Sequence, residues 1–380
     1  AVDWDQATAV PAAPPGMEYA GTSAVAELNG RMHMIVNFRY RSSDRRLSQL
    51  WRSDDGLEWD AVLLEVGNEF VGYELTTVAN TLLMTGQTGS DFALWQSVPG
   101  RSVGGSSWNR IMLDLPENLE RSFITTAANT RDEIVTVVVG NLNIWPEIIA
   151  PYLPENIDLD DPAVSYQGDQ FLYMLDGRED IRLFAQPPEV VVAGDNIWIR
   201  LTPANGDETL QTVPLPPGTY PVASNPTLAE VSLAMAWISD DANDFLAVTG
   251  TSALPDGVFF PEPWGDRFIA TAYEIANPFG TNEQALWLSG SGRAWQPATQ
   301  QPPAECSPFL TAISGSRIHL TSEDGLQCVR DIGTPWEILD EPSRSTYVIG
   351  GPAGFVGYPD SFEYDSALFS RDGIVWGEIG

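Results

Sequence analysis

Short apolar segments separated by turn residues recur along the chain. Near its start they cover residues 24–28, 32–38, 47–53 and 57–64, and near its end residues 346–350, 355–358, 366–370 and 374–379. Segments of this length, bounded by Gly, Asp, Asn and Ser, are typical of antiparallel strands joined by tight turns. The pattern therefore predicts an all-β protein in which four successive strands form one sheet.

A turn sequence of the form Ser-x-Asp-Gly-x-x-Trp, preceded by an apolar pair, repeats within this pattern. Its two best copies consist of Ser53, Asp55, Gly56 and Trp59, and of Ser370, Asp372, Gly373 and Trp376. Gly provides the positive φ of a tight turn, the Asp carboxylate can accept backbone N–H bonds across it, and the Trp can pack beneath it. These residues are therefore expected to have a structural role.

Two further copies, around Gly100 and Gly292, keep most of the motif, and three weaker ones lie around Gly177, Ala242 and Gly325. A motif that returns once in every four-stranded unit indicates a repeat architecture. Seven copies predict a seven-bladed β-propeller of four-stranded antiparallel blades, and six blades is the alternative if the weakest copies are accidental. We expect a single domain over residues 1–380, with an insertion at about 141–165.

The motif resembles the box of the Asp-box, or BNR-repeat, propellers, a sialidase-like superfamily that also includes many secreted proteins without enzymatic activity. The usual box of that family reads Ser-x-Asp-x-Gly-x-Thr-Trp, so the best copies in this chain have one residue fewer between Asp and Gly. The resemblance implies that each box lies on the turn between the third and fourth strands of a blade and has no catalytic role. A ligand would then bind on the opposite face, near the central channel.

The charge balance limits the class of partner. The 380 residues include 52 acidic and 19 basic side chains, the latter all Arg, for a net charge of −33. Nucleic acids and anionic membranes are polyanions, so this charge disfavours both as partners. No apolar stretch approaches the roughly 18 residues of a membrane-spanning helix.

The expected location is extracellular or at the cell surface. The chain begins at Ala1 without a leader pattern, which is consistent with a mature secreted form. Cys306 and Cys328 allow a single pairing, and secretion favours a disulfide between them over two buried thiols.

Four residues are candidates for ligand binding in loops assigned to the face opposite the boxes. Trp145 and Trp264 can stack on a sugar ring or on a protein partner, and the alternative is that each fills its own loop. Arg39 and Arg41 belong to a basic cluster that can bind a carboxylate or sulfate group of a polysaccharide. The alternative for these Arg residues is ion pairing with neighbouring Asp and Glu.

An acidic run predicts the candidate metal site. Asp158, Asp160 and Asp161 resemble the oxygen-rich loops that bind calcium, and the alternative is a solvated acidic loop. Apart from calcium, the sequence indicates no cofactor.

Recognisable catalytic motifs are missing from the sequence. It contains no nucleophile elbow, zinc-binding helix, phosphate-binding loop or dinucleotide fingerprint. The leading hypothesis is therefore a secreted, non-enzymatic propeller that binds a protein partner or a glycan or takes part in an extracellular assembly. The alternative is a carbohydrate-active hydrolase or lyase that uses carboxylates of the ligand face.

Overall fold

The computed structural model describes most of residues 13–379, and the longest gaps in this description cover residues 99–104, 143–163, 183–188, 249–259, 275–282 and 360–366. The regular elements of the described residues are β-strands, which confirms the expected all-β class. These residues form six sheets in succession, four of them four-stranded and two with a fifth strand, together with an insertion that contains two further sheets. Up-and-down pairing of this kind follows from strands that are joined by short turns.

The first three sheets contain the longest strands. The first sheet consists of β1 (Met17–Leu28), β2 (Arg31–Tyr40), β3 (Arg46–Ser53) and β4 (Asp60–Leu64), with β8 (Gly105–Ser106) parallel to β4. The second consists of β5 (Phe70–Val78), β6 (Thr81–Thr88), β7 (Asp91–Ser97) and β9 (Trp108–Ile111). The third consists of β10 (Leu119–Ala128), β11 (Ile134–Leu142), β19 (Glu230–Ser239) and β20 (Leu246–Ala247), and β18 (Tyr220–Asn225) pairs with the other half of β19.

The last three sheets have shorter strands. The fourth consists of β21 (Phe260–Trp264), β22 (Arg267–Glu274), β23 (Glu283–Ser289) and β24 (Gln296–Pro297). The fifth consists of β25 (Thr311–Ser314), β26 (Arg317–Thr321), β27 (Gln327–Asp331) and β28 (Glu337–Leu339). The sixth consists of β29 (Ser345–Gly351), β30 (Gly354–Pro359), β31 (Ala367–Ser370) and β32 (Gly377–Ile379).

A long insertion separates the second and third strands of the third sheet. β11 and β19 pair along their full length, so the insertion extends from Leu142 to Glu230 rather than over the expected 141–165. It contains two three-stranded sheets, formed by β12 (Val164–Gln167), β13 (Leu172–Leu175) and β14 (Glu179–Arg182), and by β15 (Glu189–Ala193), β16 (Asn196–Leu201) and β17 (Thr209–Pro214). The weak copy of the motif around Gly177 follows β13, and it therefore belongs to the insertion.

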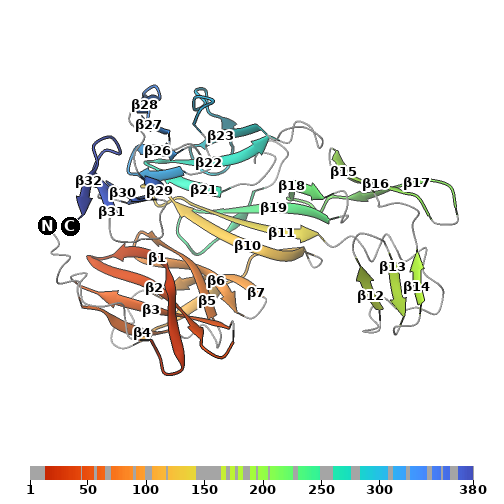
Figure 1. Cartoon of the computed structure of the whole chain (residues 1–380), viewed down its shortest axis with the longest axis horizontal. Coiled ribbons are helices and arrows are strands. Elements are labelled where there is room, and N and C mark those ends of the chain that lie inside the picture. The colour runs from red at the N-terminus through yellow and green to blue at the C-terminus, as the bar shows by residue number, and fades with distance from the viewer. Residues whose placement is uncertain are drawn as a thin grey trace.

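The six sheets follow one another around the middle of the body, with the insertion projecting to one side (Figure 1). The first strands pack next to each other in chain order, β1 with β5, then β10, β21, β25 and β29. Apolar clusters fill the spaces between adjacent sheets, and Ile35 and Leu50 of the first sheet meet Phe70 and Trp95 of the second in one of them. The sheet faces are thus covered by neighbouring sheets, while the free edges of the first strands face the middle of the body.

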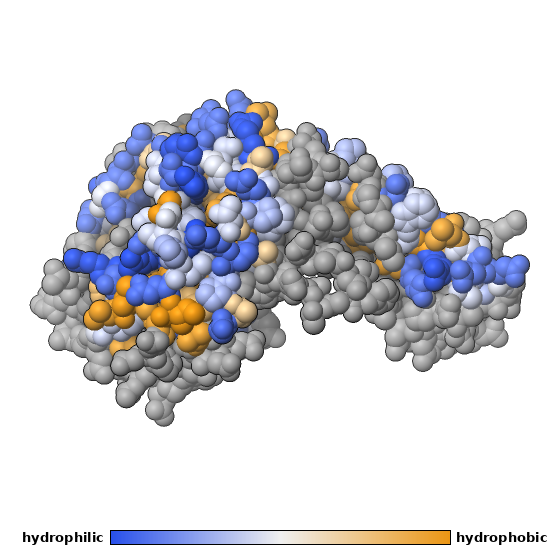
Figure 2. Space-filling view, turned by 90° about the horizontal axis from the view of Figure 1, so that it is seen from above, coloured by the Kyte–Doolittle hydropathy of each residue, from blue (hydrophilic) through white to orange (hydrophobic). Residues whose placement is uncertain are grey.

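Figure 2 shows the hydropathy of the described surface. In the view of Figure 2 it is largely hydrophilic, and one apolar patch lies on the lower left of the body. Among the described residues, no helix has the length and the apolar character needed to cross a membrane.

The box of the sixth sheet forms a turn that is capped by a carboxylate. Asp372 Oδ1 accepts the backbone N–H groups of Val375 (3.0 Å) and Ile374 (2.9 Å) and the hydroxyl of Ser370 (3.1 Å). These bonds lower the pKa of Asp372 because they favour its ionised form. Gly373 follows with φ of 72°, which a side chain would make costly. The box residues therefore determine the turn, as the motif predicts.

Other sheets repeat this turn with changes in residue type. In the third sheet, Asp241 accepts the N–H groups of Asn243 (2.9 Å) and Asp244 (3.1 Å), and Ala242 occupies the Gly position with φ of 62°. In the fourth sheet the Asp is missing and the Ser289 hydroxyl accepts the N–H of Gly292 (2.8 Å) instead.

The first box is described only in part. Ser53 is buried at the end of β3, while Asp55 and Gly56 lie outside the described residues.

The box of the fifth sheet differs from the sequence-based assignment. The segment around Gly325 connects β26 to β27, which is the second-to-third connection rather than the third-to-fourth turn. The turn between β27 and β28 instead contains Asp331, Gly333 with φ of 82°, and Trp336. This Asp-x-Gly-x-x-Trp sequence differs from the motif in two ways: it has one more residue between Asp and Gly than the best copies, and Val329 stands at the Ser position, two residues before the Asp.

The box turns also contact the preceding sheet. A Cβ on Gly292 of the fourth sheet would overlap Val135 Cγ2 of the third, and a Cβ on Gly373 of the sixth would lie 3.1 Å from His319 Cδ2 of the fifth. In the third sheet, the buried Ala242 belongs to the apolar cluster that includes Leu83 of the second sheet. Each of these turns therefore holds two adjacent sheets together.

We predict that Gly292→Ala destabilises the protein by about 1–3 kcal/mol, because the new Cβ combines overpacking against Val135 with an unfavourable positive φ. Gly290 is the matched control, since it lies in the same turn and a Cβ there would contact nothing within 4 Å. Gly290→Ala should change the stability by about 0.5 kcal/mol or less. Equal shifts of the two urea midpoints would contradict the close approach.

Candidate functional site

Two carboxylates lie on first strands that face the middle of the body. Glu74 is on β5 and Glu262 is on β21, and the charge of Glu74 acts on Glu262. On β5 the register with β6 shifts between Gly72 and Glu74, so Tyr73 is the extra residue of a β-bulge. Bulges redirect the side chains next to them, which places Glu74 off the regular alternation of its strand.

Glu74 is held by hydrogen bonds from neighbouring strands. Its carboxylate accepts the Thr125 hydroxyl (2.8 Å) and the Thr126 backbone N–H (2.9 Å) of β10, and the Thr85 hydroxyl (3.4 Å) of β6. Burial raises the pKa of Glu74, and the three donors counteract part of that effect because they favour the ionised form. Glu74 thus joins the second sheet to the third and presents a fixed carboxylate.

Glu262 has a different environment. Its side chain is solvent-exposed, although its strand β21 lies in the middle of the body (Figure 1). Desolvation by the protein around this strand, together with the nearby Glu74 carboxylate, raises the pKa of Glu262 to about 7. Near neutral pH, Glu262 is therefore present in both protonated and ionised forms, while Glu74 keeps its three donors.

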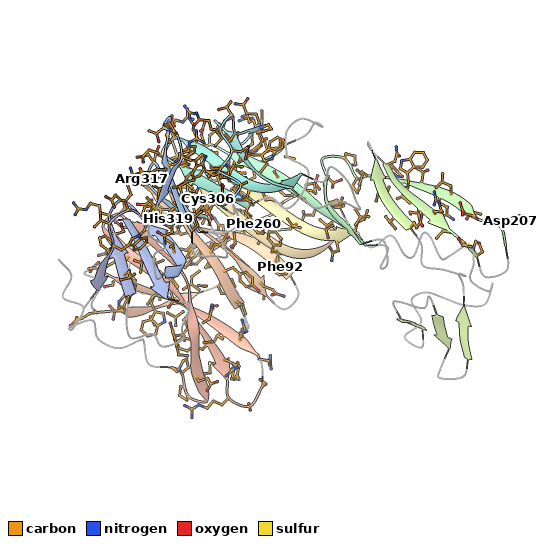
Figure 3. All side chains as sticks on the ribbon, turned by 45° about the horizontal axis from the view of Figure 1, so that its top comes forward. Phe92, Asp207, Phe260, Cys306, Arg317 and His319 are labelled. Carbon is orange, nitrogen blue, oxygen red and sulfur yellow. A yellow bond between two sulfur atoms is a disulfide. The ribbon has the colours of Figure 1, made fainter. Side chains whose placement is uncertain are left out.

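Two aromatic rings lie beside this pair of carboxylates. Phe123 of β10 and Phe260 of β21 stack with ring centroids 5.2 Å apart and an interplanar angle of 10°. Side chains two positions apart in a strand share a face, so Phe260 and Glu262 form one column and Phe123 and Thr125 form the other. Phe260 is 42% exposed and lies in the middle of the body in Figure 3. We call these residues, with Glu74, the central cluster.

The central cluster combines the groups that recognise and cleave sugars. An exposed aromatic face can stack on the apolar face of a sugar ring, and carboxylates accept hydrogen bonds from its hydroxyl groups. Two carboxyl groups whose environments differ can also serve as an acid and a base, provided that one of them is protonated near the working pH. Glu262 meets this condition on protonation, because its pKa is about 7.

The Arg candidates lie close to an acidic partner. Arg39 donates through Nε (3.0 Å) and Nη2 to Glu18 of the adjacent strand, and the charge of Arg41 also acts on Glu18. Both Arg residues are at the end of β2 and in the turn that follows, on the face opposite the box turns. The ion-pair interpretation therefore accounts for Arg39.

Trp264 lies elsewhere than its predicted place on the ligand face. It ends β21 next to the first-to-second turn of the fourth sheet, is 1% exposed, and donates its indole N–H to the backbone carbonyl of Ser316. Arg330 lies between its ring and that of Trp336, 5.8 and 5.6 Å from the two centroids. Trp264 therefore belongs to the core between the fourth and fifth sheets, because its segment is a strand rather than a loop.

Other candidates fall on residues without a description. Trp145 and the predicted calcium ligands Asp158, Asp160 and Asp161 lie outside the described residues. Within the described ranges, no group of three or more His, Cys, Asp or Glu side chains could hold a metal ion. The structure joins Cys306 and Cys328 in a disulfide, in the core between the fourth and fifth sheets.

The carboxylates of the central cluster were not singled out from the sequence. One usable signal is the Pro261-Glu262-Pro263 segment, because Pro lacks the N–H that an interior strand needs and is confined to edge strands. A strand of this composition fits the inner edge of its sheet, where its remaining side chains face the middle. No comparable signal marks Glu74, whose position depends on a bulge and on residues of other sheets.

No family model and no curated protein matches the chain. Among solved structures, the acylaminoacyl peptidase of Pyrococcus horikoshii is 8% identical with a TM-score of 0.39, covering 92% of this chain and 51% of its own. This chain thus spans about half the length of that peptidase. The β-propeller domain of the Trilobed protease from Pyrococcus furiosus is 7% identical (TM-score 0.38), covering 93% of each chain. An α-L-arabinofuranosidase from Fusarium graminearum is 10% identical (TM-score 0.35), covering 93% and 88%.

These values concern the fold alone. The chain is an all-β protein of four-stranded antiparallel sheets, and β-propeller proteins are among its structural neighbours.

The raised pKa of Glu262 predicts a specific dependence of stability on pH. Because its pKa is about 7 in the folded protein and near the ordinary 4.5 in the unfolded chain, the folded state binds more protons between these values. Stability should therefore fall as the pH rises through this window and level off above it. The thermal midpoint of Glu262→Gln should fall less than that of the wild type between about pH 5 and pH 8.

The control is Glu208→Gln, which changes an exposed carboxylate of the insertion. It should keep the wild-type dependence on pH. A wild-type profile that is also retained by Glu262→Gln would contradict the enclosed environment of Glu262.

Proposed function

We propose that the six sheets are the blades of a six-bladed β-propeller of the Asp-box type, and that the protein is a secreted module that binds a glycan at the central cluster. The observation that carries this proposal is the exposed Phe260 in the middle of the body. It stacks on Phe123 and lies two positions before Glu262 on the same face of its strand. The Cys306–Cys328 disulfide supports secretion because such bonds persist in oxidising compartments.

The number of blades in this proposal is inferred from the turns between the third and fourth strands of the sheets. Turns with a left-handed residue occur at Ala242, Gly292, Gly333 and Gly373, one in each of the last four sheets. The first two sheets carry the motif copies around Gly56 and Gly100 at the same place. Six turns thus accompany six sheets, which supports the alternative of six blades over seven.

The chemistry of the cluster indicates the class of glycan. Two acceptor carboxylates favour a ligand rich in hydroxyl donors, and they repel a uronate or a sulfate through like charge. The protein as a whole has a net charge of −33, which acts in the same direction. A neutral glycan is therefore preferred over an acidic polysaccharide at this site.

Hydrolysis of the bound glycan is the second candidate function. It is favoured by the different environments of Glu74 and Glu262, since a glycosidase needs one protonated and one ionised carboxyl group. Glu262 would donate a proton to the leaving oxygen, and Glu74 would act as base or nucleophile. The same cluster serves both candidates, so turnover distinguishes them.

Glycan binding is tested with a glycan array on the purified protein, followed by calorimetric titration of the hits. Phe260→Ala should weaken the binding of a neutral glycan by at least about tenfold, which corresponds to about 1.4 kcal/mol. The matched control is Phe369→Ala, because Phe369 is similarly exposed at 37% on β31, a third strand. Absence of any binding, or equal losses in both variants, would contradict the proposal.

Hydrolysis is tested on the glycans that bind. If Glu262 acts as general acid, Glu262→Gln should lower the rate by about 10²–10⁴-fold, and the wild-type rate should fall as the pH rises above about 7. Binding without turnover in the wild type would leave glycan binding as the function and exclude the hydrolase. Turnover that persists in Glu262→Gln would place the catalytic acid elsewhere.

A further inference from the structure

A concave site that is distinct from the central cluster lies between the second and third sheets. It is a cavity of about 300 Å³ whose walls are formed by β7, β9, the segment that leads from β9 to β10, and parts of β10 and β11. Neither carboxylate of the central cluster lines it. Because a blade-to-blade connection forms one wall, the cavity is on the face opposite the box turns.

The walls of the cavity are apolar and incompletely covered. The exposure of residues 111–115 alternates along the segment: Ile111, Leu113 and Leu115 are half-buried, while Met112 and Asp114 are exposed. On the other side the cavity is lined by core residues such as Leu94 and Ile124, which are 0% and 5% exposed. Three aliphatic side chains thus leave part of their apolar surface open to water. A ligand whose apolar group covered this surface would be bound more tightly, in proportion to the area removed from water.

Two oppositely charged residues, Arg110 and Asp114, also line the cavity, and both are exposed. For a charged ligand end, the attraction of one of these residues is offset by the repulsion of the other. An uncharged hydroxyl or amide avoids this conflict, since it can accept from the guanidinium and donate to the carboxylate.

We propose that this cavity binds a small amphiphile with a branched aliphatic or aromatic body and an uncharged polar end. The volume is at the lower limit for ligand sites in proteins, about 300–1,000 Å³, which restricts the ligand to a small molecule. Stacking of Phe92 on Tyr73, with ring centroids 5.8 Å apart, fixes one wall from the side of the bulged strand β5. The inference does not depend on glycan binding at the central cluster.

The test uses three probes that share one body: 4-methyl-1-pentanol, 4-methylpentanoate and 4-methylpentylamine. Each is titrated into the full chain with ¹³C-labelled Leu, Ile and Val methyl groups, and methyl chemical shifts are followed by NMR. We expect saturable shifts of the Leu94, Leu113 and Ile124 methyl groups with the alcohol, and at least about threefold weaker binding of the two charged probes. Tighter binding of the acid or the amine would overturn the assignment of an uncharged end.

Leu113→Trp fills the cavity and should weaken alcohol binding by at least about tenfold. Leu210→Trp is the control, because Leu210 is 62% exposed on the insertion, and it should bind like the wild type. A second filling variant, Ile111→Phe, covers the case in which Leu113→Trp does not fold. Absence of saturable shifts in the wild type, or unchanged binding in a folded filling variant, would overturn the proposal.

Discussion

The constraint on which this structure depends is the close fit between a box turn and the sheet that precedes it. At Gly373 the chain turns with a positive φ, Asp372 satisfies the N–H groups that the turn leaves unpaired, and the backbone reaches the His319 ring of the neighbouring sheet. At Gly292 the same contact is made with Val135. A bulkier residue at either position would push two sheets apart, so a few small turn residues control the spacing of the whole arrangement.

Arg residues support these turns from the outside. Arg131 donates through Nη2 to the carbonyl groups of Asp266 (2.5 Å) and Gly290 (2.6 Å), and Arg317 donates to the carbonyl of Asp372 (2.7 Å) of the next sheet. Arg330 similarly donates to two carbonyls while lying between two Trp rings. A guanidinium carries five N–H donors in a planar arrangement, and the single ammonium of Lys cannot reproduce this geometry. The exclusive use of Arg in the chain thus has a structural function at these positions.

The sequence was informative where the determinants are local. Turn chemistry alone located the box of the sixth sheet, since Ser370, Asp372 and Gly373 form it within four residues. The sequence was not informative where the pairing of distant segments decides the fold. Nothing before Glu230 shows that the insertion separates the second strand of the third sheet from the third. In the fifth sheet, the weak copy around Gly325 precedes the third strand, because the pairing of β26 with β27 places this segment between the second and third strands.

The central cluster was out of reach of the sequence for the same reason. Its members come from β5, β10 and β21, and the enclosure that raises the pKa of Glu262 arises only when separate sheets meet. Phe123 pairs with Val139 in the half of the third sheet that leads to Leu142, where the insertion begins. The insertion therefore leaves the body on the same face as the stacked Phe123 and Phe260.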